Sequence, residues 1–466
     1  MIVHWHRRDL RPTDNTALAR AADSDTIVPV FIIDPSLLAY AGPPRVVFML
    51  DCLSHLRDWY RARESGLIIR VGHPPSELSQ IAQQYGAGRV VWNKDYSGLA
   101  QDRDDEVRSS LHRQGIGTAM YADALLHEPG SITTQTGEAY SVYSYFWRKW
   151  RDREPDRPHP TPADTHLEAV SGASIPTHRE LGFKDPEADV PAAGIEAANK
   201  RLEAFCDGPI YEYADHRDIP AADATARLSS HLKWGTIGIR QVIKSVKQAT
   251  TNAPDEKAAE SCETFTSQLA WRDFYGHVLA AAPHITSRNH RSYEQPINWR
   301  EDPDELRAWK DGRTGFPIVD AGMRQLRAEA FMHNRVRMIV ASFLTKDLLL
   351  DWREGYAWFR DKLADHDTAN DSCGWQWVAG TGADAQPYFR VFNPMTQAER
   401  FDPDGEYIRT HVTELQGVPS DIIHNWHRLA PEERVAEAPY YPEPIVDHAV
   451  RREQAIEMFE VARTSE

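Results

Sequence analysis

The first 33 residues, MIVHWHRRDLRPTDNTALARAADSDTIVPVFII (1–33), contain two apolar runs separated by an amphipathic stretch. The runs IVHW (2–5) and TIVPVFII (26–33) are typical of buried strands, and residues 15–22 between them predict a helix. Strands joined by a helix in this way lie parallel in one sheet. The N-terminus therefore predicts a parallel sheet covered by helices.

The same alternation continues to about residue 125. Further strands are predicted at 67–71, 89–93 and 118–121, and further helices at 44–63, 76–86 and 101–114. Residues 1–125 should therefore form an α/β domain with helices on both faces of the sheet.

A connecting segment and a helical half follow this domain. Residues 126–194 include the Pro- and Asp-rich, aperiodic stretch REPDRPHPTPADTH (153–166), which predicts an interdomain linker. From residue 195 onward, apolar residues recur at helical spacing, as in TFTSQLAWRDFYGHVLAAA (264–282). Residues 195–466 are therefore predicted to form an all-helical domain.

Composition and motif spacing exclude several classes of protein. No run of 18 apolar residues exists, and the N-terminus lacks the apolar stretch of a signal peptide, so we expect a cytoplasmic protein that does not span a membrane. The four cysteines are far apart, and Asp365, His366 and Asp367 have no second ligand cluster beside them. We therefore expect no metal site.

The net charge of −16 bears on nucleic-acid binding, because phosphate neutralisation normally supplies much of the affinity. Either the chain does not bind nucleic acid, or a local basic face lies on a generally acidic surface. Arginine far outnumbers lysine among the 53 basic residues, which favours the second alternative. An acidic, lysine-poor surface is also what a protein working in concentrated salt would need.

Aromatic and arginine side chains gather in the helical half. The run EAFMHNRVRM (329–338) places His333 and two arginines before an apolar helix, where the arginines could cap, snorkel or bind a phosphate-bearing ligand. Residues 365–394 mix carboxylates, amides and glycines, which suits a loop around a polar heterocycle. Seven tryptophans either fill the core or serve stacking or electron transfer: Trp271, Trp299, Trp309, Trp352, Trp358, Trp375 and Trp377.

These motifs resemble the photolyase/cryptochrome family along the whole chain, and within it the class I cyclobutane pyrimidine dimer photolyases of a haloarchaeal-like, deazaflavin-binding branch. The resemblance implies a Rossmann-like antenna domain followed by a helical domain that binds FAD in a folded shape. The matching segments are HWHRRDLRPTDN (4–15), TARLSSHLKWGTIGIR (225–240), LAWRDFY (269–275), TGFPIVDAGMRQL (314–326), MHNRVRMIVASFLTKDLLLDWREG (332–355) and DTANDSCGWQW (367–377).

Carried over by position, the resemblance implies an FAD site. An ion pair between Arg337 and Asp365 would fix the flavin ring, or would simply tie two helices together. Several positions depart from the family pattern: Ala226 replaces a phosphate-loop serine, Gln268 a glutamate, and Asp371 the usual asparagine opposite flavin N5. The dipeptide Ser372-Cys373 stands where Asn-Gly is common. The implied FAD-binding residues are Tyr213, Thr225, Ala226, Arg227, Leu228, Ser229, Gln268, Arg272, Asn334, Arg337, Asp365, His366, Asp367 and Asp371.

The implied substrate is a pyrimidine dimer that is flipped out of DNA. Reduced, anionic FAD would donate one electron to the dimer in light and recover it after the ring splits. Trp375, Trp352 and Trp299, in this order outward, would photoreduce an oxidised flavin. Trp271 and Trp377 would sandwich the dimer, within a set of DNA-binding residues that comprises Arg217, Gln268, Trp271, Asn334, Arg335, Met338, Trp377 and Gln397.

The resemblance also implies an antenna chromophore. Arg45, Asp95 and Lys233 match the branch that binds an 8-hydroxy-5-deazaflavin, with a methenyl folate as the alternative. Lys233 and Asp95 could instead be ordinary surface charges.

Two functions remain open: light-dependent repair of DNA by a monomeric enzyme, and a cryptochrome-type blue-light photoreceptor without repair activity. Met338 favours repair of cyclobutane dimers.

Overall fold

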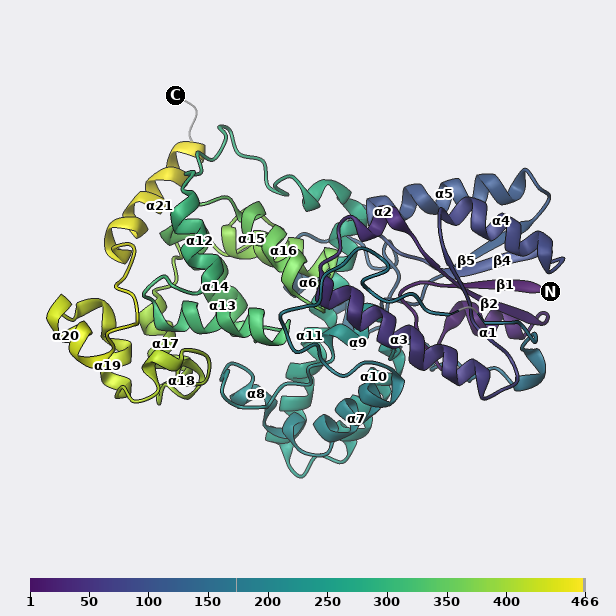
Figure 1. The fold of residues 1–466 in the computed structure, drawn as a ribbon, viewed down its shortest axis with the longest axis horizontal. Coiled ribbons are helices and arrows are strands. Elements are labelled where there is room, and N and C mark those ends of the chain that lie inside the picture. The colour runs from purple at the N-terminus through teal and green to yellow at the C-terminus, as the bar shows by residue number, and fades with distance from the viewer. Residues whose placement is uncertain (173, 464–466) are drawn as a thin grey trace.

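A computed structural model describes residues 1–172 and 174–463 of the chain. An α/β domain, which contains the N-terminus, packs beside a larger helical domain, which contains the C-terminal helix (Figure 1). Within the described residues, the helices lack a stretch that is both long and apolar enough to cross a lipid bilayer.

The α/β domain is built on a five-stranded parallel sheet with the order β3-β2-β1-β4-β5. Val3 in the central strand lies opposite Val28 on one side and Val90 on the other. The central strands are buried on both faces, which explains their nearly continuous apolar sequences. Each strand lies where the sequence predicts it: β1 (Ile2–His6), β2 (Ile27–Ile33), β3 (Ile68–Val71), β4 (Arg89–Asn93) and β5 (Gly117–Tyr121).

Helices cover both faces of this sheet, as predicted. Leu78 and Val107 pack with Val3 on one face, whereas Leu18 packs with Ile2 on the other. The five helices of the domain are α1 (Thr16–Ala22), α2 (Pro35–Leu38), α3 (Pro43–Arg61), α4 (Pro74–Gln84) and α5 (Gly98–His112).

The segment predicted as a linker is only partly an extended connection. Residues Tyr143–Arg151 form helix α6, whose Phe146 and Trp150 are buried in the core of the helical domain. The aromatic periodicity of YSYFWRKW supports this helix, because its apolar rings fall on one face. The division of the chain at residues 125 and 195 remains a proposal, and α6 belongs by its packing to the helical side.

The helical domain packs around two large apolar cores, one formed largely by α12 to α19 and one by α6, α7, α10 and α11. Its helices are α7 (Ile195–Cys206), α8 (Tyr213–His216), α9 (Ser229–Trp234), α10 (Ile239–Thr251), α11 (Glu256–Ala281), α12 (Pro303–Asp311), α13 (Pro317–Glu329), α14 (Asn334–Ser342), α15 (Trp352–Lys362), α16 (Thr368–Ala379), α17 (Pro394–Phe401), α18 (Glu406–His411), α19 (Ser420–His424), α20 (Pro431–Glu437) and α21 (His448–Arg463). Short 3-10 turns lie at Asp164–His166, Pro209–Glu212, Pro283–Thr286, Thr413–Leu415 and Trp426–Arg428, and a π-helical turn at Phe343–Asp347.

Buried ion pairs join the two domains. Arg240 of α10 donates to Asp14 and to Asp123 of the α/β domain, each at 2.6 Å. Gly235, which ends α9 with φ of 64°, lies so close that an added Cβ would meet the Arg8 carbonyl oxygen at 2.1 Å. The domains are therefore fitted tightly to each other, and residues from both can line a shared cavity.

Candidate active site

A cavity of about 370 Å³ lies in the helical domain between α11, α14 and α16. On each helix, the lining residues recur at i, i+3, i+4 and i+7, which places them on one face. Most residues predicted to hold the flavin ring or the dimer therefore meet here. The lining comprises Gln268, Trp271, Arg272 and Tyr275 on α11; Asn334, Arg337, Met338 and Ala341 on α14; Asn370, Asp371, Gly374, Trp375, Trp377 and Val378 on α16; and Arg217 and Phe359.

Arg337 is held at the cavity wall by two carboxylates. Its Nη2 donates to both oxygens of Asp365, at 2.8 and 3.1 Å, and its Nη1 lies 3.7 Å from Asp371. Burial alone would lower the pKa of Arg337, but the two carboxylates raise it. The predicted Arg337–Asp365 pair is thus present, and it also ties α14 to the segment that precedes α16. A fixed cation beside amides and carboxylates fits the polar edge of a flavin, while Phe359 and Trp375 fit its ring.

The start of α16 separates this cavity from the α/β domain. Asp367 caps the helix by accepting from the Asn370 N–H, and its own N–H donates to Asp371 Oδ2 at 2.8 Å. His366 Nδ1 also lies 2.9 Å from Asp371 Oδ2. Asp365, His366 and Asp367 therefore stand behind the cavity wall and not in its lining, which differs from the predicted placement. Asp367 is turned away from the cavity because its carboxylate forms an ion pair with Arg8 of the α/β domain.

The predicted phosphate-binding segment, residues 225–229, lies outside the lining and leads into α9. Arg227 has φ of 45°, a left-handed backbone that turns the chain sharply. The guanidinium of Arg227 lies 5.1 Å from the ring centre of Phe331, and that of Arg337 lies 5.7 Å from the same ring. Phe331 thus links this segment, Thr225, Ala226, Arg227, Leu228 and Ser229, to the cavity.

Tyr213 is buried nearby in an aromatic cluster and does not line the cavity. Its ring contacts Phe205 and Phe265 with centroid distances of 5.8 and 5.3 Å. Arg217 lies 5.5 Å from the Tyr213 ring centre and donates to Gln268 Oε1 at 3.2 Å. Tyr213 therefore positions Arg217, which does line the cavity.

Two of the predicted DNA-binding residues lie away from the lining. Arg335 donates to Asp218 at 2.7 Å and stacks over Phe401. Gln397 is half-buried on α17. Arg335 points away from the cavity because Arg337, two residues later on α14, occupies the opposite side of the helix.

The predicted sandwich between two tryptophans stays a prediction, and the structure adds one constraint to it. Trp271 and Trp377 both line the cavity, but one face of Trp271 is already covered. Tyr143 of α6 stacks on it with a centroid distance of 3.8 Å and an angle of 10° between the rings. Only the other face of Trp271 is left for a base.

Of the three tryptophans of the predicted electron-transfer chain, Trp375 lines the cavity. Trp352 is fully buried, and Trp299 is half-buried and contacts Phe459 of α21. Their order outward from the flavin stays a prediction. Gly355 lies against Trp375 so closely that a Cβ would meet the indole at 2.0 Å. Since Trp352 lies three residues before Gly355 on α15, both face α16. The ring of Trp309 also contacts Trp375, with a centroid distance of 6.1 Å.

A second cavity, of about 490 Å³, lies between the two domains and contains all three residues predicted for the antenna. Arg45 is 7% exposed, and its Nη1 has no hydrogen-bond partner in the part of the chain that the structure describes. Burial lowers the pKa of Lys233 to about 7. Burial would raise the pKa of Asp95, but Arg8 and further cations hold it well below its usual range. Lys233 and Asp95 are therefore not ordinary surface charges.

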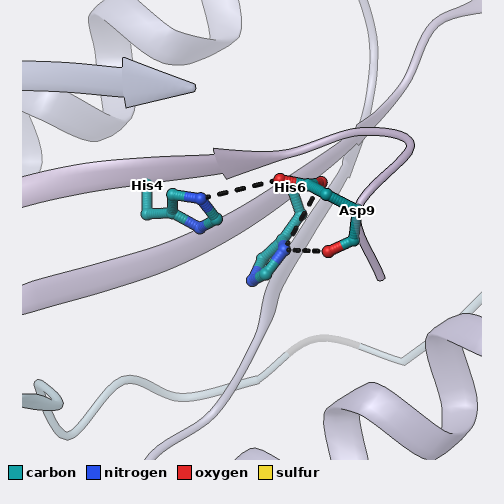
Figure 2. Close-up of side chains that lie close together, drawn as sticks. All are labelled: His4, His6 and Asp9. Carbon is teal, nitrogen blue, oxygen red and sulfur yellow. Dashed lines mark hydrogen bonds and ion pairs between the residues drawn. The ribbon is translucent and has the colours of Figure 1, made fainter. Parts of the chain in front are cut away.

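Apart from the two cavities, the structure contains a buried cluster of His4, His6 and Asp9 at the end of β1, which the sequence analysis did not predict. Figure 2 shows His4, His6 and Asp9 turned toward one another, with the Asp9 carboxylate 3.8 Å from His4 Nε2 and 3.6 Å from His6 Nδ1. Their ligand atoms lie within 4.8 Å of one another. Asp9 already accepts from the Arg7 N–H and Asn93, and burial lowers the pKa of His4 to about 3. The cluster thus places a neutral His4 beside the buried Asp9 carboxylate at the end of β1. The alternation His-x-His along a strand was the available signal.

Other site residues escaped the sequence analysis for different reasons. Tyr275 and Asn370 share helix faces with predicted residues, so helical spacing could have revealed them. Arg8 contacts Asp95 and Asp367, and therefore links the interdomain cavity to the wall of the helical cavity. Tyr143 comes from the predicted linker. Arg8 lies in the matching motif HWHRRDLRPTDN and Tyr143 in the aromatic run YSYFWRKW, but neither pattern predicts their contacts, because these depend on tertiary packing.

Comparison with known proteins agrees with this geometry. The chain matches the family described as DNA photolyase over residues 2–165 and the family described as FAD binding domain of DNA photolyase over residues 265–461. It is 56% identical to the deoxyribodipyrimidine photo-lyase of Halobacterium salinarum, with 100% of both chains covered.

Solved structures give the same result. The class III photolyase of Agrobacterium tumefaciens is 35% identical, with a TM-score of 0.91 over 99% of this chain and 97% of that one. An archaeal photolyase from Sulfolobus tokodaii, solved with two FAD molecules, is 32% identical, with a TM-score of 0.84 over 99% of each chain. The helical domain is thus an FAD-binding domain, and the chain as a whole belongs to the DNA photolyase family.

Proposed function

We propose that this chain splits cyclobutane pyrimidine dimers in DNA, using light and FAD bound in the helical cavity. The observation that carries the proposal is the composition of that cavity, where a paired Arg337 and Asp371 form a polar wall and Trp271 and Trp377 offer aromatic surface. Full-length similarity to a deoxyribodipyrimidine photo-lyase supports the same reaction. When bound in its reduced, anionic form, FAD would supply one electron to the dimer and would recover it once the ring has split.

The chain's own residues bind, orient and exclude water. Arg337, Asn334 and Asp371 would hold the polar edge of the flavin, and residues 225–229 with Tyr213 would hold its phosphate and ribityl portion. Trp271 would stack on one base of the dimer through its open face, which contributes about 1–3 kcal/mol. Phe359 and Trp375 keep the site apolar, which strengthens the electrostatic contacts within it.

Contacts with the DNA backbone are proposed for Arg217, which lines the cavity, and for Arg335 and Gln397, which lie outside its lining. Arg217 has its guanidinium beside Gln268, so one hydrogen-bonded unit can reach both the bases and a phosphate. Arg335 is held by Asp218, so a phosphate would have to share it with this carboxylate.

One chain carries both cavities, and we propose a monomer; light scattering on the purified protein would measure its mass.

One experiment separates repair from a cryptochrome-type photoreceptor. Purified, reduced protein is illuminated with an oligonucleotide that contains one thymine dimer, and the restored thymines are quantified. We expect restoration in light and none in the dark. A protein that binds FAD and responds to blue light but restores no thymine would be a photoreceptor, and the repair proposal would be wrong.

For the interdomain cavity, we propose an anionic aromatic antenna, with 8-hydroxy-5-deazaflavin favoured over a methenyl folate. Lys233 and Arg45 offer cationic groups inside the cavity, and exposed Leu37, Tyr40 and Leu99 form an apolar rim. The two FAD molecules in the Sulfolobus tokodaii structure make a second flavin a third candidate. Protein isolated from its native host should show the absorption band of a bound deazaflavin; a folate band, or two flavins per chain, would contradict this assignment.

A further inference from the structure

Tyr143 lies behind Trp271 as seen from the helical cavity. Trp271 lines the cavity and Tyr143 does not. The two rings are nearly parallel, with centroids 3.8 Å apart, a separation that gives full contact between aromatic faces. One face of Trp271 is therefore occupied by protein, and the opposite face is presented to the cavity.

Tyr143 is itself held at two points. Its hydroxyl donates to the Ser267 carbonyl oxygen at 2.6 Å, one turn before Trp271 on α11. Its N–H donates to Asp384 Oδ2 at 3.2 Å, and the Asp384 N–H donates to the Ser141 carbonyl oxygen at 2.9 Å. Burial raises the pKa of Tyr143 above its ordinary value, so its hydroxyl remains a donor at physiological pH. The ring cannot shift without loss of these contacts.

These contacts determine how well the Trp271 ring is ordered before the substrate binds. A half-buried indole with one unsupported face could rotate, and fixing it on binding would weaken affinity. The stack with Tyr143 fixes the ring in advance. Its other aromatic neighbours, Phe274 and Tyr275, contact it only edge-on or tilted, at 5.5 and 5.4 Å. The parallel stack is thus the contact that sets the plane of Trp271.

We propose that Tyr143 is a positioning residue for dimer recognition: it orients Trp271 so that one indole face is ready to stack on the flipped-out lesion. The inference rests on the proposed repair function and deepens it, because it assigns part of the lesion specificity to helix α6, outside the FAD-binding helices. Tyr143 should affect affinity for damaged DNA and leave affinity for undamaged DNA unchanged.

The test compares Tyr143→Leu with Tyr143→Phe. Binding of FAD-loaded protein to a dimer-containing oligonucleotide and to its undamaged counterpart is measured in the dark by fluorescence anisotropy. Tyr143→Leu removes the stack and should weaken binding of the damaged DNA about tenfold, with undamaged DNA unaffected. Tyr143→Phe keeps the stack and should stay within about twofold of the wild type.

The matched control is Trp147→Leu on the same helix. Trp147 stacks on Trp150 with a centroid distance of 5.6 Å and does not line the cavity. Its replacement disturbs α6 to a similar extent and should leave both affinities unchanged. An equal loss in the control, or an equal loss on both DNAs with Tyr143→Leu, would show that Tyr143 only stabilises the helix and would overturn the proposal.

A second variant keeps the proposal testable if Tyr143→Leu does not fold. Asp384 has φ of 45°, which glycine adopts without strain, so Asp384→Gly removes the carboxylate that holds the Tyr143 N–H. It should weaken binding of damaged DNA about threefold, in the same selective way. Unchanged selectivity in this variant would contradict the inference. If the wild type itself does not distinguish damaged from undamaged DNA, the proposed repair function fails, and this inference fails with it.

Discussion

The helical cavity and the interdomain cavity differ in how their charges are paired. In the helical cavity, Arg337 is bound by Asp365 and lies near Asp371. In the interdomain cavity, Arg45 retains an unpartnered guanidinium nitrogen among the described residues, and Lys233 has its pKa lowered to about 7. In the first cavity Arg337 already has carboxylate partners without a ligand, whereas in the second burial lowers the pKa of both Arg45 and Lys233.

This difference indicates two modes of ligand binding. A prearranged ion pair orients a ligand but gains little new charge pairing, so removal of either partner should damage the site itself. Partly desolvated cations gain a partner when an anion binds, so their removal should weaken the ligand and spare the protein.

The largest effect is expected for Arg337→Met. This change leaves Asp365, whose side chain is 2% exposed, as a buried carboxylate without its cation, which costs about 3–5 kcal/mol. FAD should be lost during desalting, and the free energy of unfolding in urea should fall. The double variant Arg337→Met/Asp365→Leu should recover part of the stability but not FAD binding.

Arg335→Met is the control for that prediction. Its partner Asp218 is 30% exposed, so the ion pair should contribute less than about 1 kcal/mol. If Arg337→Met keeps FAD as well as Arg335→Met does, Arg337 does not hold the flavin.

The second largest effect concerns Trp352→Phe. Trp352 is buried and donates through Nε1 to Asn289 at 3.0 Å, away from the cavity lining. Photoreduction of oxidised flavin should slow by more than about tenfold, while repair by chemically reduced enzyme stays near wild type, because a similarly sized aromatic replacement costs less than about 1.5 kcal/mol. Equal loss of both activities would show that Trp352 is mainly a packing residue.

The sequence predicted the fold because both domains carry their patterns locally. Buried parallel strands such as β2 read as apolar runs, and the faces of α11 and α14 carry the cavity residues at helical spacing. The contacts of Tyr143 and Arg8 could not be predicted in this way, since each reaches a residue more than 80 positions away. The same holds for Asp367, whose carboxylate turns to the other domain. Motifs locate residues on elements, but tertiary packing decides which cavity they face.

A smaller effect is expected for Lys233→Met in the interdomain cavity. Because burial lowers the pKa of Lys233 to about 7, the free protein loses this charge as pH rises through 7. Affinity for an anionic antenna should therefore fall by up to about tenfold between pH 6 and pH 8.5, as measured by fluorescence titration. Lys233→Met should bind more weakly at pH 6 and lose this pH dependence; a wild-type affinity that does not change with pH would contradict the role of Lys233.

The smallest effect comes from a second buried lysine, which lines neither of the two cavities described above. Lys346 donates to the Ala379 carbonyl oxygen at 3.0 Å and lies 3.6 Å from the ring centre of Phe459 in α21. Burial lowers its pKa from 10.5 to about 7. Between these values the unfolded chain holds more protons than the folded protein, so this group makes stability rise with pH.

Lys346→Met removes this pH-dependent contribution to the free energy of unfolding. Relative to the variant, the wild type should gain on the order of 1–2 kcal/mol in free energy of unfolding between pH 7 and pH 9. The difference in stability between the wild type and Lys233→Met should show the same trend without antenna. It should disappear once an anion occupies the cavity, since the bound anion restores the charge on Lys233 in the wild type. For Lys346 the trend should persist whatever the antenna content, because carbonyl oxygens and an aromatic ring surround its ammonium group. Parallel urea titrations with and without antenna would check this. If the antenna changed the pH dependence that Lys346 gives to the free energy of unfolding, the two lysines would not differ in the way proposed.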